Sequence, residues 1–142
     1  MNNYKHTIQY YETDKMGITH HSNYIRFMED ARVYFLRQAG FPYEKFEEEG
    51  AIPPVVSITC DYKKTTTFPD ELEIEVSVLE ISPVKFKLQY LMTVNDKLAC
   101  SATSTHCFLS TDGRPVNIKK QYPDFFEALD QLKEKETTTA KN

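Results

Sequence analysis

The sequence predicts an α+β fold in which an antiparallel sheet curves around one early helix. Two observations lead to this fold class. Apolar side chains recur at the helical period of 3.6 residues over residues 22–39. Residues 56–108 contain four segments in which apolar and polar side chains alternate, as in strands with one covered face. A helix followed by a run of strands is typical of α+β proteins, and wrapping the sheet around the helix buries both apolar surfaces.

The N-terminal segments predict a strand, a turn-rich loop and then the main helix. Residues 4–11 are rich in β-forming side chains. The loop that follows contains Gly17, and glycine adopts left-handed backbone angles freely. Ser22 or Asn23 is placed to cap the helix, and Gly40 follows its end. Apolar side chains on more than one side of this helix predict that other elements surround it.

The second half of the chain predicts the sheet. A short helix is expected over residues 43–50 and an amphipathic helix over residues 122–132. Tight connections at residues 82–83 and 95–96 predict that consecutive strands are antiparallel neighbours. Acidic and basic side chains on these strands could then pair across the sheet, namely Glu73 and Glu75 with Lys85 and Lys87. The four expected strands cover residues 56–62, 71–78, 84–92 and 98–108.

Composition excludes several classes of protein. The chain has 142 residues, and 40% of them are hydrophobic, which suffices for the core of a single domain. We expect this domain over residues 1–132 and a flexible tail over residues 133–142, where few apolar side chains occur. A net charge of −4 argues against bulk electrostatic binding of nucleic acid. The sequence shows no long apolar segment of the kind that predicts a membrane span. It also shows no apolar N-terminal region of the kind that predicts a secretion signal.

The cysteines indicate a reducing compartment. Cys60, Cys100 and Cys107 are an odd number without a Cys-x-x-Cys pair, which favours neither a disulfide framework nor a zinc site. All three lie in alternating segments, where thiols usually pack as small apolar groups. We therefore expect a cytoplasmic protein without a bound metal or cofactor.

Asp14 is the first candidate for chemistry. It lies between the first strand and the helix, seven residues before His21. A loop that leads into a helix N-terminus lies near unpaired backbone N–H groups with partial positive charge. Such groups can stabilise a carbonyl oxygen that becomes an oxyanion. A carboxylate beside them suits acyl transfer or hydrolysis, whereas an aspartate that only closes a turn is the alternative.

Other candidates are less specific. The pKa of histidine lies near neutrality, so His21 could act as a general base or orient a ligand, or could be an ordinary helix-start histidine. The adjacent His20 and His21 point in different directions and would chelate a metal poorly. The chain contains no nucleophile elbow, glycine-rich phosphate loop or dinucleotide motif. Basic side chains could bind phosphates or simply face solvent; these are Lys63, Lys64, Lys85, Lys87 and, near the end of the last strand, Arg114, Lys119 and Lys120.

The segment YYETDKMGITHHSNY (residues 10–24), followed by Glu29-Asp30-Ala31-Arg32, resembles the 4-hydroxybenzoyl-CoA thioesterase group of hot-dog-fold acyl-CoA thioesterases. The pattern of that group is an Asp, a Gly three residues later, an aromatic residue or His, an Asn/Ser-Tyr pair and a long helix. Residues 61–62 and 68–72 also match, so the likeness covers residues 4–130.

The resemblance implies a hot-dog fold, with a long central helix wrapped by a curved antiparallel sheet, and a dimer with active sites at the subunit interface. It implies that Asp14 is the catalytic carboxylate, that Gly17 shapes the loop, and that the backbone N–H of His21 polarises the thioester carbonyl. Asn23 and Tyr24 match the pair at the helix start, which has a structural part in that group, and we expect them in the substrate-binding region. Basic positions matched to the CoA phosphates are Lys85 and, nearby, Lys64 and Lys87.

We therefore expect an acyl-CoA thioesterase that releases a carboxylic acid and CoA, with Asp14 as general base or nucleophile. A hot-dog dehydratase, an acyl-carrier-protein thioesterase and a non-catalytic acyl-CoA-binding module are the alternatives. The expected partners are the acyl-CoA substrate and further copies of the chain in a homodimer or homotetramer, because sheet edges need covering. Neither nucleic acid nor a membrane is an expected partner.

Overall fold

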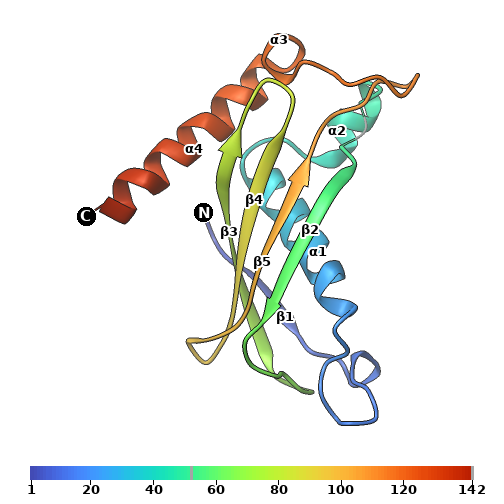
Figure 1. Ribbon diagram of the computed structural model, residues 1–142, viewed down its shortest axis with the longest axis vertical. Coiled ribbons are helices and arrows are strands. Elements are labelled where there is room, and N and C mark those ends of the chain that lie inside the picture. Colours follow the sequence, from blue (N-terminus) through green and yellow to red (C-terminus); the bar gives the residue numbers. More distant parts are fainter. Residues whose placement is uncertain (52, 142) are drawn as a thin grey trace.

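The computed structural model describes residues 1–51 and 53–141, with side chains described up to residue 133. The first half contains the strand β1 (Tyr4–Thr7), the 3-10 helix η1 (Tyr10–Glu12) and the helices α1 (Asn23–Gln38) and α2 (Tyr43–Glu48). The four long strands are β2 (Val55–Tyr62), β3 (Glu71–Ile81), β4 (Phe86–Val94) and β5 (Lys97–His106). Two helices, α3 (Ile118–Gln121) and α4 (Pro123–Lys141), complete the chain (Figure 1).

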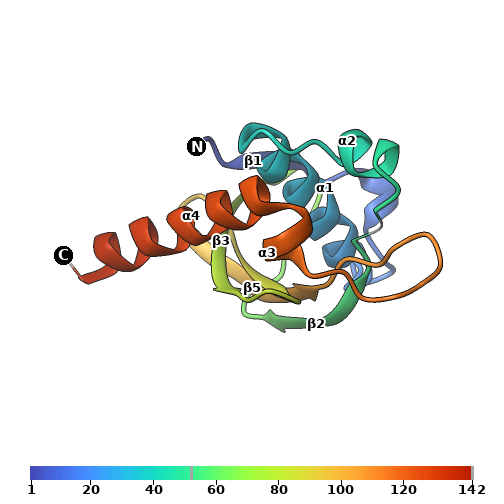
Figure 2. The ribbon, with the colours of Figure 1, turned by 90° about the horizontal axis from the view of Figure 1, so that it is seen from above.

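The strands form an antiparallel sheet in the order β1-β3-β4-β5-β2. Hairpins join β3 to β4 and β4 to β5, as the tight connections predict. Seen from above, α1 lies inside the curve of this sheet, and β2 forms one edge (Figure 2). The predicted architecture, a long helix wrapped by a curved antiparallel sheet, is therefore confirmed.

The core lies between α1 and the inner face of the sheet. Along β4, the alternate residues Phe86, Leu88, Tyr90 and Met92 are all fully buried, as expected for strands with one covered face. The helix contributes side chains from more than one side, because it is enclosed: the buried ones are Tyr24, Phe27, Met28, Ala31, Arg32, Phe35 and Leu36. Among the described residues, no helix is both long and apolar enough to cross a membrane.

A chain of polar contacts crosses this core. The Arg32 guanidinium donates from Nε to the Tyr43 hydroxyl (2.8 Å) and from Nη1 to the Tyr90 hydroxyl (3.1 Å). The Tyr90 hydroxyl lies 2.6 Å from Ser104 Oγ, which in turn lies 2.7 Å from His106 Nε2. Burial, together with the positive charge of Arg32, lowers the pKa of His106 from 6.5 to about 3. His106 is therefore neutral in the folded protein at neutral pH.

The strand boundaries shift by up to three residues, and the first strand, the cap of α1 and the end of the last helix differ more clearly from the sequence-based expectation. The first strand ends at Thr7 rather than at residue 11, and the chain then turns through η1. Helix α1 begins after Ser22, but neither candidate cap acts as one: the Ser22 hydroxyl bonds to His20 Nδ1, and the Asn23 amide donates to the Glu12 carbonyl. Helix α4 continues to Lys141, past the expected end at residue 132. The flexibility of residues 133–142 stays a prediction, and Asn142 lies outside the described residues.

The expected cross-strand ion pairs are also wrong. Glu73 faces Thr93 and Glu75 faces Leu91, whereas Lys87 faces Glu80. Lys85 lies in the turn between β3 and β4, where its N–H donates to Ser82 Oγ. The position of the hairpin accounts for this difference: the chain turns between Ile81 and Phe86, so residues near the turn face one another and Glu73 and Glu75 face residues far beyond Lys87.

The buried His106 predicts a loss of stability in acid. The unfolded chain takes up a proton on His106 below about pH 6.5, whereas the folded chain does not until about pH 3. The stability that depends on a neutral His106 is thus fully present above pH 6.5, and it is lost as the pH falls toward 3. Between pH 7 and 4.5, we expect the free energy of unfolding to fall by roughly 2 to 3 kcal/mol more in the wild type than in His106→Gln. Urea unfolding at both pH values measures this difference, and equal pH dependence of the two proteins would contradict it.

Candidate functional site

The residues between η1 and α1 form a closed loop, here called the Asp14 loop (residues 13–19). Thr13 and Thr19 pair at its base in an antiparallel bridge. Inside the loop, the N–H of Asp14 donates to the Ile18 carbonyl, and the N–H of Gly17 donates to the Asp14 carbonyl, both at 2.9 Å. Gly17 has φ +79°, a conformation that side-chain-bearing residues rarely adopt. The loop glycine therefore permits the turn that the sequence predicts.

The connection between β2 and β3 holds the Asp14 loop from the side. The N–H of Thr19 donates to the Thr66 carbonyl (2.8 Å), and the Thr67 hydroxyl donates to the Gly17 carbonyl (2.6 Å). The buried Thr66 hydroxyl lies 2.7 Å from Thr19 Oγ1 and 2.8 Å from the Tyr24 hydroxyl. These contacts join the Asp14 loop to the β2–β3 connection and to α1.

A cavity of about 270 Å³ opens beside this loop. Asp14 and Thr19 line it from the loop, and His21 and Tyr24 line it at the start of α1. Lys63 and Lys64 line it from the residues that directly follow β2. The structure thus brings together five of the candidate residues, which are Asp14, His21, Tyr24, Lys63 and Lys64.

A larger cavity of about 640 Å³ lies between the N-terminal residues, β3 and α4. Among the described residues that line it, none is Lys, Arg or His, and Glu75 is the single carboxylate. It contains none of the candidate residues. We therefore place the candidate site at the smaller cavity, where a carboxylate, backbone N–H groups and two lysines meet.

The Asp14 carboxylate is oriented by its own loop. Its Oδ1 accepts the N–H of Met16 at 2.8 Å, which is a local turn of the kind that aspartate favours. Among the described residues, no donor bonds to Oδ2. The side chain is half-buried and lines the cavity. Asp14 therefore closes a turn with one oxygen and presents a carboxylate to the cavity at the same time.

The start of α1 supplies a backbone donor. The N–H groups of His20, Asn23 and Tyr24 are all occupied by nearby carbonyl oxygens. The N–H of Ser22 donates to His20 Nδ1. Among the described residues, no acceptor bonds to the N–H of His21. Because His21 lines the cavity, this N–H is the first at the helix start that is available to a ligand.

Aromatic side chains form one wall. The rings of Tyr24 and Tyr62 meet edge to face, with their centroids 5.2 Å apart. The Tyr62 hydroxyl donates to the His21 carbonyl at 3.2 Å. The His21 ring lies edge-on to Tyr62 and stacks on His20. Partial burial, with Cys60 nearby, raises the pKa of Tyr62 to about 12, so the phenol keeps its proton. The sequence did not single out Tyr62 as a site residue, although its match to the family pattern at residues 61–62 was a usable signal.

The remaining candidates lie apart from the cavity or behind it. The Asn23 side chain donates to the Glu12 carbonyl and thus holds the loop rather than facing the cavity. Lys85 and Lys87 lie at the other end of the sheet, next to the pair Phe86–His106. Lys63 and Lys64 instead bond through their N–H groups to Ala99. Ala99 and His106 are seven residue steps apart on β5, which is about 24 Å along the strand.

The donor set does not suggest a metal centre. Within residues 1–51 and 53–141, no three His, Cys, Asp or Glu side chains come together as a metal ion would require.

Comparisons with known proteins agree with this geometry. Residues 8–133 match the model of the thioesterase-like superfamily. A protein of Aquifex aeolicus named as a putative esterase is 37% identical over 83% of this chain and 91% of its own length. The putative acyl-CoA thioesterase YneP of Bacillus subtilis is 30% identical over 89% of this chain and 93% of its own length.

A solved structure extends the likeness to the fold. The DHNA-CoA thioesterase of Staphylococcus aureus superposes with a TM-score of 0.91 at 26% sequence identity, covering 97% of this chain and 94% of the other. The hot-dog architecture inferred from the residue 10–24 motif is thereby confirmed. With a family match over residues 8–133 and relatives that align over most of their length, the chain belongs to the thioesterase-like superfamily.

Proposed function

We propose that the protein is an acyl-CoA thioesterase, which hydrolyses an acyl-CoA to a carboxylic acid and CoA. One observation carries this proposal: Asp14 and His21 line the same cavity, and the N–H of His21 has no acceptor among the described residues. The names of the Bacillus and Staphylococcus relatives support thioester hydrolysis as the reaction.

The proposed mechanism uses the two groups in sequence. The thioester carbonyl accepts the N–H of His21, and the N-terminus of α1 adds favourable electrostatic potential. Asp14 then acts either as a general base that takes a proton from water or as a nucleophile that forms an acyl anhydride. In both routes, negative charge develops on the carbonyl oxygen beside this N–H. The C–S bond breaks, the CoA sulfur takes up a proton, and water supplies the oxygen of the acid.

The rest of the cavity suits an acyl-CoA. Tyr24 and Tyr62 form an apolar wall for the acyl group. Lys63 and Lys64 are placed to attract the CoA phosphates at the cavity rim. Asn23 acts from behind by tying α1 to the base of the Asp14 loop.

We further propose that two copies pair through β2 in a homodimer, and that two such dimers can form a homotetramer. β2 is an edge strand that pairs within the chain with β5 alone, and its residue Val56 is 51% exposed. An exposed apolar edge is a template for another strand. Since Tyr62 ends β2 and lines the cavity, pairing there would bring a second copy next to the site. Because Cys60, Cys100 and Cys107 are free thiols, we propose the cytoplasm as the location.

Asp14→Asn tests the catalytic proposal. The amide keeps the turn with Met16 but cannot take a proton or attack the thioester. We expect kcat to fall by about 10² to 10⁴ with an unchanged melting temperature, measured as release of free thiol from acyl-CoA. The matched control is Asp112→Asn, since Asp112 lies in an exposed turn outside the cavity. Wild-type thiol release by the Asp14→Asn protein would refute the proposal.

Lysine variants test the phosphate contacts. We expect the double variant Lys63→Ala, Lys64→Ala to raise KM for acyl-CoA by about tenfold or more, because charged hydrogen bonds to phosphate are lost. KM for a short acyl thioester without phosphates should not change. The control is Lys85→Ala, Lys87→Ala, whose positions lie at the far end of the sheet. If the Lys85 and Lys87 variant raises KM and the Lys63 and Lys64 variant does not, the proposed phosphate contacts are wrong.

The dimer proposal predicts the effect of a charge on the edge strand. Val56→Lys places a charge where β2 would meet a second copy, so it should convert a dimer or tetramer into a monomer at micromolar concentration. Sedimentation velocity measures the change. Val84→Lys is the matched control, because Val84 is similarly exposed (47%) but lies in the turn before β4. A wild-type chain that already sediments as a monomer would contradict the proposal.

A further inference from the structure

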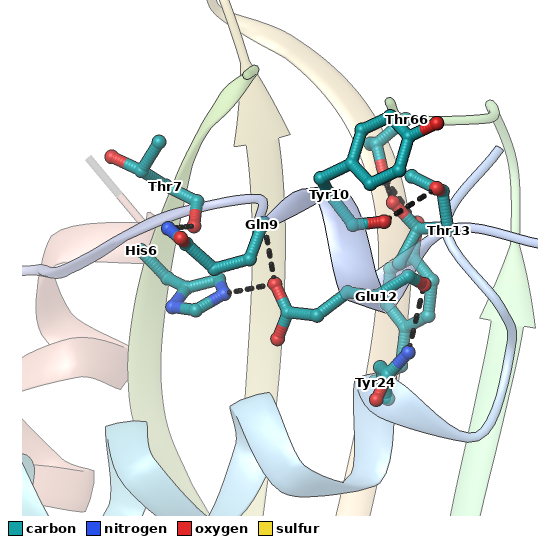
Figure 3. Close-up of polar contacts among 10 residues, drawn as sticks. His6, Thr7, Gln9, Tyr10, Glu12, Thr13, Tyr24 and Thr66 are labelled. Carbon is teal, nitrogen blue, oxygen red and sulfur yellow. Dashed lines mark hydrogen bonds and ion pairs between the residues drawn. The ribbon is translucent and has the colours of Figure 1, made fainter. Parts of the chain in front are cut away.

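Glu12 is a buried carboxylate that the proposed mechanism does not use. It ends η1, two residues before Asp14, and is only 8% exposed. Its Oε1 accepts the N–H of Gln9 at 2.7 Å and lies 2.9 Å from His6 Nε2 (Figure 3). A carboxylate so placed is costly to bury unless it is hydrogen-bonded, so these two contacts hold it in one orientation.

The main chain of the same residue holds the Asp14 loop. The Glu12 carbonyl accepts the N–H of His20 at 2.8 Å and the side-chain amide of Asn23 at 2.9 Å. The Asp14 loop therefore begins directly after Glu12, and the hydrogen bond from His20 to the Glu12 carbonyl closes it. The next residue after His20 supplies the N–H proposed to bind the thioester oxygen. One residue thus joins β1, the base of the Asp14 loop and the start of α1.

His6 cannot easily move away from this contact. Its ring lies against Phe27 of α1, with centroids 4.4 Å apart, and Phe27 is fully buried in the core. The His6–Glu12 contact therefore links the Asp14 loop to the hydrophobic core through Phe27. Glu12 itself is not among the residues that line the cavity, so we assign it an action through its neighbours.

We propose that Glu12 is a positioning residue for thioester hydrolysis: its side chain, held by His6 and Gln9, fixes the separation between the Asp14 carboxylate and the N–H of His21. This inference depends on the function proposed above. Small displacements of reacting groups reduce the rate strongly while affecting binding little. Loss of the Glu12 contacts should therefore lower kcat and leave KM unchanged.

The test compares Glu12→Ala with Glu12→Gln. The alanine removes the acceptor for Gln9 and His6, and we expect kcat to fall by about 10²-fold with KM within about twofold of the wild type. The glutamine keeps a side-chain oxygen for the Gln9 N–H, so kcat should recover to within about threefold of the wild type. Glu29→Ala, an exposed substitution on α1, is the matched control. Melting temperatures and thiol release are measured for each protein.

The outcomes separate this inference from the proposed function. If Asp14→Asn is inactive but Glu12→Ala has the wild-type kcat, the positioning role is wrong and the function stands. If Asp14→Asn is fully active, the function itself fails. A parallel loss of kcat and rise of KM in Glu12→Ala would overturn the role as stated. If Glu12→Ala does not fold, His6→Ala decides: a lower kcat at unchanged KM supports the role, and a wild-type kcat overturns it.

Discussion

The enclosure of α1 by the sheet is the constraint on which the site depends. A helix that is buried on several sides by Phe27, Met28 and Phe35 cannot shift without opening the core. Its N-terminus is consequently fixed near the end of β2, and the first available N–H group has a fixed position relative to the strands. The Asp14 loop then only has to present a carboxylate to a point that the fold has already defined.

The loop itself is held by contacts from three directions. Thr66 and Thr67 bind it from the β2–β3 connection, Glu12 holds both of its ends, and an internal turn orients Asp14. A site in which donors and acceptors are placed before the substrate arrives needs little reorganisation during the reaction. The sheet, the helix and the loop therefore act as one scaffold, although they come from separate parts of the chain.

Periodicity predicted most of the fold, because strands with one covered face and an enclosed helix leave strong patterns in the sequence. The Asp14-to-Tyr24 segment predicted that Asp14, His21 and Tyr24 lie together, since these residues are close in the sequence, but it did not indicate Tyr62, which reaches the cavity from β2. Contacts that depend on register were not predictable: Tyr24 meets Thr66 across 42 residues, and no local pattern indicates such a pair. β-Propensity also failed at Tyr10 and Tyr11, where the bond from Gln9 to Glu12 turns the chain out of the strand.

The polar chain through the core has a consequence for the rotation of α1. A helix surrounded only by hydrocarbon could settle into neighbouring rotational settings of similar energy, because apolar contacts are not directional. In the observed setting, Arg32 donates to the hydroxyls of Tyr43 and Tyr90, and a rotation of α1 that broke these bonds would leave a buried guanidinium without acceptors, at a high cost in free energy. The hydrogen bonds of Arg32 thus favour one rotation of α1 about its own axis. With this rotation, the first turn of the helix faces the cavity.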